Sequence, residues 1–240
     1  MNLGITCFAR NQGGKGHRRQ RAAVPRKSKP GEPFDPSCRL CPRLAGFLDS
    51  VYRQFPSYHC RPVAPFGVLR PRLLVVGLAP GMHGANRTGR PFTGDHAGIL
   101  LYRTLHRTGF ANRPESVARG DGLKLLDCRV SNAVKCLPPG NRPLPDEVRR
   151  CNRYLVRELA TLPPGAVIVA LGAVAHGAVL RALSLRAGAY RFAHGAEYAL
   201  AGRITLLDSY HCSRLNTNTG RLTPAMFVRI FTRARHLIDG

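Results

Sequence analysis

The chain is poor in acidic residues, and it contains no apolar run long enough to cross a membrane. Only 13 Asp and Glu stand against 37 Lys and Arg, which gives a formal net charge of +24 and a sequence pI near 11.1. The beginning of the chain also lacks the continuous apolar stretch of a secretory signal. We therefore expect a cytoplasmic protein without membrane contact. The charge favours a polyanion such as nucleic acid as the partner, and an arginine-rich coding bias is the alternative explanation.

The length and charge distribution predict one folded domain with a basic tail. A chain of 240 residues, 44% of them hydrophobic, suffices for one sizeable core and is too short for two typical domains with linkers. Residues 1–30 carry eight Lys and Arg and no acid, which predicts a disordered tail that adds nonspecific DNA affinity or is a dispensable extension. Subtracting these eight charges from +24 leaves +16 on residues 31–240. We expect this domain to be basic by itself and monomeric.

Apolar runs alternate with segments of helical periodicity along residues 41–240. Strands are expected at 72–78, 128–134, 166–172 and 203–209, and helices at 41–55, 96–110, 145–161, 173–184 and 223–238. Such alternation predicts the α/β class, with a parallel sheet covered by helices on both faces.

Polar, Gly-rich segments follow three of the expected strands. GLAPGMHGANRTGRPFTGD follows the first strand, NAVKCLPPGNRPLP leaves the second, and HCSRLNTNTGRLT leaves the last. Ligands of open α/β sheets bind outside the carboxyl ends of the strands. The three segments are therefore predicted to meet at one active-site crevice.

Four of the eight cysteines have a spacing that suits a metal centre. Cys38 and Cys41 form a CxxC pair, and Cys136 and Cys151 can supply two further ligands to zinc or to an iron–sulfur cluster. The other four have no matching spacing and are interpreted as buried or incidental thiols: Cys7, Cys60, Cys128 and Cys212.

Several motifs in a fixed order carry a resemblance to a known family. CRLCPRL, GLAPGMHGANRTGRPFTGD, SNAVKC with the later Cys151, and HCSRLNTNTGRLT together resemble the family 5 (type b) uracil-DNA glycosylases over about residues 35–238. The resemblance implies a three-layer α/β/α sandwich with a four-stranded parallel sheet. It also implies a [4Fe-4S] cluster, and excision of uracil, and of bases such as hypoxanthine or xanthine, from DNA without strand cleavage. We expect such a protein to associate with the nucleoid.

The same resemblance assigns a base-binding role to several side chains. Phe92 is suited to stacking on a flipped base, with a core aromatic as the alternative. Asn132 can match the O4 and N3–H edge of uracil, and His211 matches the residue that donates to O2 of the departing base. Backbone amides that can cradle the base or fix the attacking water come from the first loop: Gly77, Leu78, Ala79 and Gly81.

Asn86 matches the family position at which a polar residue such as Asp or Asn assists the attacking water in some members, whereas other members have an apolar residue there. An amide can orient water but is no efficient general base, so we expect catalysis to depend mainly on electrostatic stabilisation. Asp95 is the nearby carboxylate, and its place in TGD favours a cap at the start of the 96–110 helix.

The last loop has the small polar and cationic groups that hold a phosphate backbone. The expected DNA contacts are Ser213, Arg214, Asn216 and Arg221, together with Leu215. Leu215 either wedges into the gap left by the flipped base or covers the interior of its own loop. Cys212 stands where the family usually has Pro, which puts the rigidity of this loop in question.

Two other functions stay open on the sequence. The chain could bind damaged DNA through an iron–sulfur domain without turnover, or it could be a nucleotide hydrolase that carries zinc. A structural role of the cluster is favoured, and a redox role is the alternative.

Overall fold

The computed structural model describes residue 1 and residues 34–240, so the predicted basic tail at 1–30 lies almost wholly outside the described residues. The helices are α1 (Pro42–Gln54), α2 (Ala85–Thr88), α3 (His96–Arg107), α4 (Pro145–Ala160), α5 (Ala173–Ala182), α6 (Arg214–Asn218) and α7 (Pro224–Asp239). The strands are β1 (Phe66–Gly67), β2 (Leu73–Gly77), β3 (Cys128–Asn132), β4 (Val167–Leu171), β5 (Glu197–Leu200) and β6 (Ile204–Ser209). Short 3₁₀ turns lie at η1 (Pro139–Asn141), η2 (Ala187–Ala189) and η3 (Ala201–Arg203).

One sheet of six strands runs through the molecule in the order β1-β3-β2-β4-β6-β5. The four strands expected from the sequence, β2, β3, β4 and β6, are its parallel centre. The expected sheet of four strands was incomplete, because β1 and β5 add antiparallel edges. β1 has two residues and β5 alternates between exposed and half-buried positions, so neither carries the continuous apolar run of a central strand.

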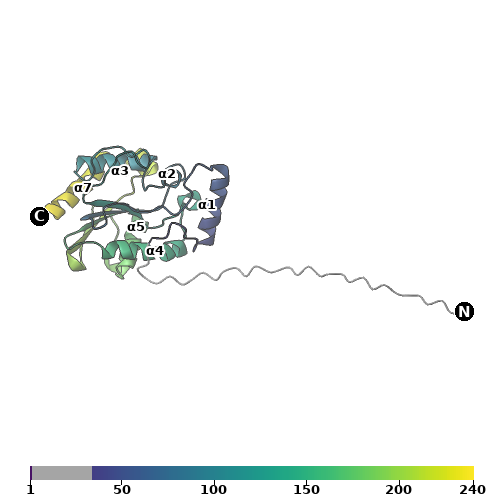
Figure 1. Cartoon of the computed structure of the whole chain (residues 1–240). Coiled ribbons are helices and arrows are strands. Elements are labelled where there is room, and N and C mark those ends of the chain that lie inside the picture. Colours follow the sequence, from purple (N-terminus) through teal and green to yellow (C-terminus); the bar gives the residue numbers. More distant parts are fainter. Residues whose placement is uncertain (2–33) are drawn as a thin grey trace.

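Helices cover both faces of the sheet, as the predicted three-layer arrangement requires (Figure 1). α3 and α7 pack over one face around a buried core that includes Leu101, Phe227 and Phe231. α4 and α5 cover the other face, where Leu155 and Val179 meet the strands. Every residue of β2 and β4 is buried, which explains why these strands read as unbroken apolar runs. None of the described helices is long and apolar enough to cross a membrane.

A third cluster of buried residues lies where α1 packs beside the start of α4. Leu44, Leu48 and Val51 on α1 meet Val134 and Tyr154, and all four predicted cysteine ligands belong to this cluster. α1 stands at one end of the layers in Figure 1, away from α7. The cysteine region thus lies at the end of the layers where α1 stands.

Candidate functional site

One cavity of about 410 Å³ opens at the carboxyl ends of β2, β3 and β6, and we call it the strand-end pocket. Its lining comes from the loops after these three strands and from the start of α3: Leu78, Ala79, Gly81, Ala85, Phe92, Asp95, His96, Ala97, Asn132, Asn141, His211, Ser213 and Arg214. The three segments that the sequence analysis placed at one crevice therefore do meet there.

Two rings form one wall of the strand-end pocket. The Phe92 and His211 rings lie 6.0 Å apart between centroids, with an angle of 29° between their planes. Phe92 is held at a φ of +52°, a conformation that few residues other than Gly adopt without cost. Such strain in a loop residue at a cavity is a sign of a functional position.

Gly77 does not line the pocket, although the sequence analysis placed it among the base-binding residues. A Cβ atom at Gly77 would lie 2.4 Å from Cζ of Phe92 and 2.5 Å from Oδ1 of Asn132. The missing side chain therefore gives these two residues the space that they occupy. Ala79 and Gly81, by contrast, contribute to the lining directly.

Asn132 ends β3 opposite Gly77 and presents an unpaired acceptor. Its side chain is buried, and Oδ1 has no hydrogen-bond partner among the described residues. A buried polar atom without a partner costs free energy, roughly 1–3 kcal/mol. A ligand with an N–H group at this point would satisfy the atom.

His211 follows β6 and is uncharged at neutral pH. Burial lowers the pKa of its imidazole to about 4. The side-chain amide of Asn216 donates to the His211 carbonyl at 2.8 Å, which fixes the backbone that carries the ring. A neutral imidazole offers one N–H donor to a ligand in the pocket.

The structure places Asn86 outside the strand-end pocket. Asn86 lies in α2 with no exposed surface, its Nδ2 donates to the sulfur of Cys60 at 3.5 Å, and its Oδ1 has no partner among the described residues. Asp95 caps α3 through Gly98 N–H at 2.9 Å, as expected, but it also lines the pocket. Burial raises the pKa of Asp95 above its ordinary value. The sequence analysis noted Asp95 as the nearby carboxylate and favoured the capping role, because the TGD pattern gives no sign of what the free side of the carboxylate faces.

The last loop contains a short helix, α6, that orients its polar groups. Ser213 caps α6 by accepting the Asn216 N–H, and Arg214 reaches the rim of the pocket with an exposed side chain. Leu215 is 71% exposed, which excludes burial inside its own loop. Arg221 does not line the pocket. Its guanidinium carbon lies 4.5 Å from the centroid of the Tyr210 ring, over which it stacks.

Cys212 is fully buried beneath this loop. Its sulfur lies 3.5 Å from the Ala97 carbonyl at the start of α3. The loop is therefore packed onto α3 at Cys212.

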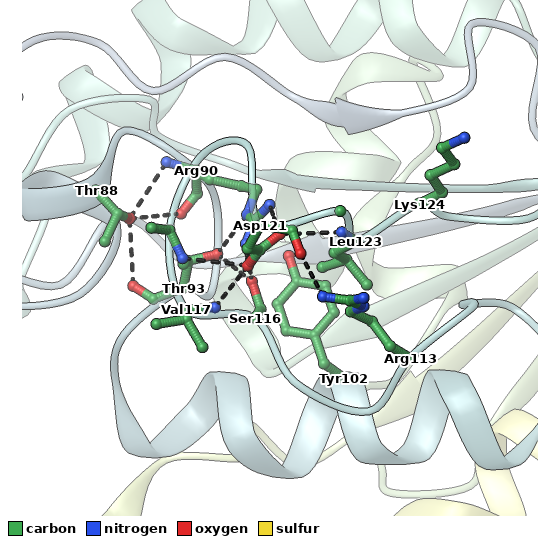
Figure 2. A network of polar contacts seen from close by, with 12 residues as sticks. Thr88, Arg90, Thr93, Tyr102, Arg113, Ser116, Val117, Asp121, Leu123 and Lys124 are labelled. Atoms are coloured by element: carbon green, nitrogen blue, oxygen red, sulfur yellow. Dashed lines mark hydrogen bonds and ion pairs between the residues drawn. The ribbon is translucent and has the colours of Figure 1, made fainter.

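A polar network that the sequence analysis missed supports the Phe92 loop (Figure 2). The buried Arg90 guanidinium donates through Nη1 and Nη2 to Asp121, at 3.0 Å for Nη1. Asp121 also accepts the backbone N–H groups of Val117, Ala118 and Leu123 at 2.8 to 3.2 Å. Residues 116–123 are thereby tied to the segment that carries Phe92, and the two charges pair across 31 residues of sequence.

The four predicted metal ligands line a second cavity, which we call the cysteine pocket. Cys38 and Cys41 come from the segment just before α1, Cys136 from the segment after β3, and Cys151 from α4. The lining otherwise includes apolar side chains and three cationic residues: Lys135, Arg150 and Arg153.

Donors point at two of the sulfurs in the cysteine pocket. Arg153 Nη2 lies 3.1 Å from the sulfur of Cys38, and the Lys135 backbone N–H lies 3.2 Å from that of Cys151. Burial and the neighbouring thiols nevertheless raise the pKa of Cys136, and burial raises that of Cys151 to about 11. Thiolates at this place therefore need a positively charged partner.

Comparison with known proteins gives one consistent result. Residues 64–235 match the family model of the uracil DNA glycosylase superfamily. The type-5 uracil-DNA glycosylase of Thermus thermophilus is 48% identical over 84% of this chain and 94% of its own length, and that of Pyrobaculum aerophilum is 44% identical over 82% and 88%. The type-4 uracil-DNA glycosylase of Thermotoga maritima is 39% identical over 45% of this chain and 49% of its own length.

Proposed function

Because the chain belongs to the uracil DNA glycosylase superfamily, among its type-5 members, we propose that it hydrolyses the N-glycosidic bond of uracil in DNA and leaves the strand uncut. One observation carries the proposal: the strand-end pocket combines a strained aromatic ring, an unpaired amide oxygen and a neutral imidazole. We expect the enzyme to act on nucleoid DNA as a monomer.

Phe92 and Asn132 recognise the flipped base. Stacking on the Phe92 ring is open to any planar base, so discrimination falls to Asn132. Its Oδ1 accepts N3–H of uracil while its amide group donates to O4, and cytosine presents the reverse pattern. Hypoxanthine and xanthine carry an equivalent N–H beside a carbonyl, and we include them among the substrates.

His211 stabilises the departing base. Negative charge develops on the base as the glycosidic bond breaks, and the His211 N–H faces O2, where that charge gathers. Loss of one such donor costs roughly 10²–10³ in kcat in other enzymes. Since the pKa of His211 is near 4, its ring does not titrate between pH 5 and 8, and it contributes no change of kcat in this range.

Asp95 is the group in the pocket that can hold the attacking water. Asn86 contributes to the packing of α2 against Cys60, and its side chain does not line the pocket. A half-buried carboxylate beside the base accepts a hydrogen bond from water, and it stabilises the positive charge that develops on the sugar.

The α6 loop contacts the DNA backbone. Arg214 at the rim neutralises a phosphate, and Ser213 and Asn216 hold the loop in shape. Exposed Leu215 fills the space that the flipped nucleotide leaves, which offsets part of the few kcal/mol that extrusion costs. Arg221 supports Tyr210 and contributes to the positive potential around the loop.

Cys38, Cys41, Cys136 and Cys151 hold a [4Fe-4S] cluster in this proposal. The described residues contain no group of three or more His, Cys, Asp or Glu side chains that could hold one metal ion, yet four cysteines line one cavity. Zinc can also take four Cys ligands, but four Cys thiolates are the usual ligand set of a [4Fe-4S] cluster. Its irons supply the positive charge that the buried thiolates need.

The cluster serves as a brace rather than as an electron carrier. Its ligands tie the segment before α1 to the segment after β3 and to α4, two elements that lie far from α1 in the sequence. Metal binding that joins such elements adds directly to the stability of the fold.

Comparison of wild type with His211→Ala and Asn132→Ala on DNA containing a single uracil tests the proposed function. Wild type is expected to leave an alkali-sensitive abasic site, and both variants are expected to bind DNA but to lose most excision. A wild type that binds this DNA and releases no base would instead establish a binding protein without turnover. Iron rather than zinc in the purified protein is expected, and zinc would contradict the cluster.

A further inference from the structure

Lys135 is a buried charge that lies between the two pockets. Its side chain is 1% exposed, and its Nζ donates to Glu158 Oε1 at 2.7 Å, to the Asn132 carbonyl at 2.9 Å and to the Ser131 hydroxyl. The three donors of the ammonium group therefore have three partners.

The same residue also touches the cysteine pocket through its backbone. The Lys135 N–H lies 3.2 Å from the sulfur of Cys151, and Cys136 is its chain neighbour. Cys151 and Glu158 are seven residues apart on α4, which is two helical turns, so they share one face of this helix. α4 is thus fastened to the segment after β3 at two points, one at a sulfur and one at an ion pair.

A buried ion pair is by itself weak evidence of a gain in stability. Buried pairs of charges can often be replaced by apolar side chains of similar size without loss of stability, because the cost of removing both charges from water offsets their attraction. An apolar pair, however, could not donate to the Asn132 carbonyl. The amide oxygen of Asn132 accepts no hydrogen bond from the described residues, so no such bond holds the side chain in place. The direction of this oxygen therefore depends on the backbone of Asn132, which the bond from Lys135 fixes.

We propose that Lys135 is a positioning residue that, held by Glu158, fixes the backbone of Asn132 and so sets how sharply the enzyme distinguishes uracil from cytosine. The inference rests on the proposed function, in which Asn132 reads the base. It adds a residue that does not contact the base, and it assigns to α4 a role at the strand-end pocket.

The test replaces both charges together. Lys135→Met alone leaves Glu158 buried without a partner and is expected to lower the Tm by about 10 °C. The double variant Lys135→Met with Glu158→Leu removes both charges and is expected to regain most of that Tm with iron content unchanged. Lys124→Met, at an exposed lysine on a loop away from the strand-end pocket, is the matched control and should behave as wild type.

The decisive readout is base discrimination. DNA with a 2′-fluorinated deoxyuridine, which resists cleavage, is compared with DNA that has cytosine at the same position. The preference for uracil in Kd is expected to fall about tenfold in the double variant, and kcat on cleavable DNA to fall with it. If the double variant recovers both its Tm and the full preference for uracil, the pair is only structural and the inference is wrong.

Two further arms separate the possible failures. Asn132→Ala should lose the same preference; if it does not, Asn132 does not read the base, and both the inference and this part of the proposed function are wrong. Lys135→Arg keeps the charge but moves the donors away from the Asn132 carbonyl. At a temperature where this variant is folded it should lower kcat/KM for uracil, and an unchanged kcat/KM would contradict the inference even if the double variant fails to fold.

Discussion

Replacement of Asp121 by Asn is expected to destabilise the protein strongly, because it leaves the Arg90 guanidinium buried without a counter-charge. The exposed fractions of the two side chains are 5% for Arg90 and 14% for Asp121. Removal of one partner of such a pair costs about 3–5 kcal/mol. For a domain of this size each kcal/mol corresponds to about 2–4 °C, so the Tm should fall by about 10 °C in a thermal melt at pH 7.

The pH dependence of this loss follows from the same contacts. The Arg90 guanidinium and three backbone N–H groups hold the pKa of Asp121 far below its ordinary value. The carboxylate therefore stabilises the fold fully above about pH 4, and this stabilisation is lost as the pH falls further. The difference in Tm between wild type and Asp121→Asn should shrink as the pH falls below about 4.

Asp49→Asn is the matched control. Asp49 pairs with Arg39 on the surface, where both side chains are about half exposed, so its loss should leave the Tm unchanged. Because residues 116–123 support the loop of Phe92, Asp121→Asn should also raise the KM for DNA containing uracil at temperatures where it is folded. Equal Tm values for Asp121→Asn and wild type at pH 7, or a difference that does not shrink as the pH falls from 5 to 2, would refute the reasoning.

Three further predictions concern the pocket, the cluster and the tail. Gly77→Ala should lower the free energy of unfolding by about 1–3 kcal/mol and abolish most of the excision activity, because its Cβ would overlap the ring of Phe92. Chemical denaturation measures this loss. The control, Gly46→Ala, lies in open space on α1 and should stabilise the protein in the same experiment. Cys136→Ala should lose iron and brown colour together with Tm, and a preserved Tm with lost DNA-dependent electrochemistry would favour a redox role. Deletion of residues 1–30, which removes eight cationic side chains, should make the salt dependence of DNA binding shallower at unchanged kcat, and an unchanged slope would show the tail to be dispensable.

The four central strands could be predicted because they are buried and therefore consist mostly of consecutive apolar residues. β2, β3, β4 and β6 begin and end within two residues of the expected limits, since central parallel strands need apolar residues on both faces. β1 and β5 could not be predicted in this way. They exist through pairing with β3 and β6, and a strand of two residues has no periodicity of its own.

The candidate site was predictable where motifs carry it and not where distant residues meet. Phe92, Asn132 and His211 stand in segments whose order resembles the family, and the structure brings them to one pocket. Their roles, and those of the four cysteines, remain predictions. Asp95 and Asn86 show what a position in the sequence does not predict. The two residues are nine positions apart, and only the fold decides which of their side chains faces the cavity.

Contacts between side chains that are far apart in the chain could not be predicted from the sequence. Arg90 and Asp121 are 31 residues apart, and Lys135 and Glu158 are 23 apart. In a chain with 37 Lys and Arg, nothing in the sequence indicates which of the few acids pairs with which cation. Only the packing of the loop at 116–123 and of α4 selects these partners.

The most direct test of the proposed function is the incubation of anaerobically purified protein, with its iron, with labelled DNA that contains one uracil, followed by alkali. Wild type should yield strand breaks at the uracil only after alkali, and His211→Ala should yield at most about a hundredth of that rate. No alkali-sensitive site with wild type, or equal rates for wild type and His211→Ala, would contradict excision at the strand-end pocket.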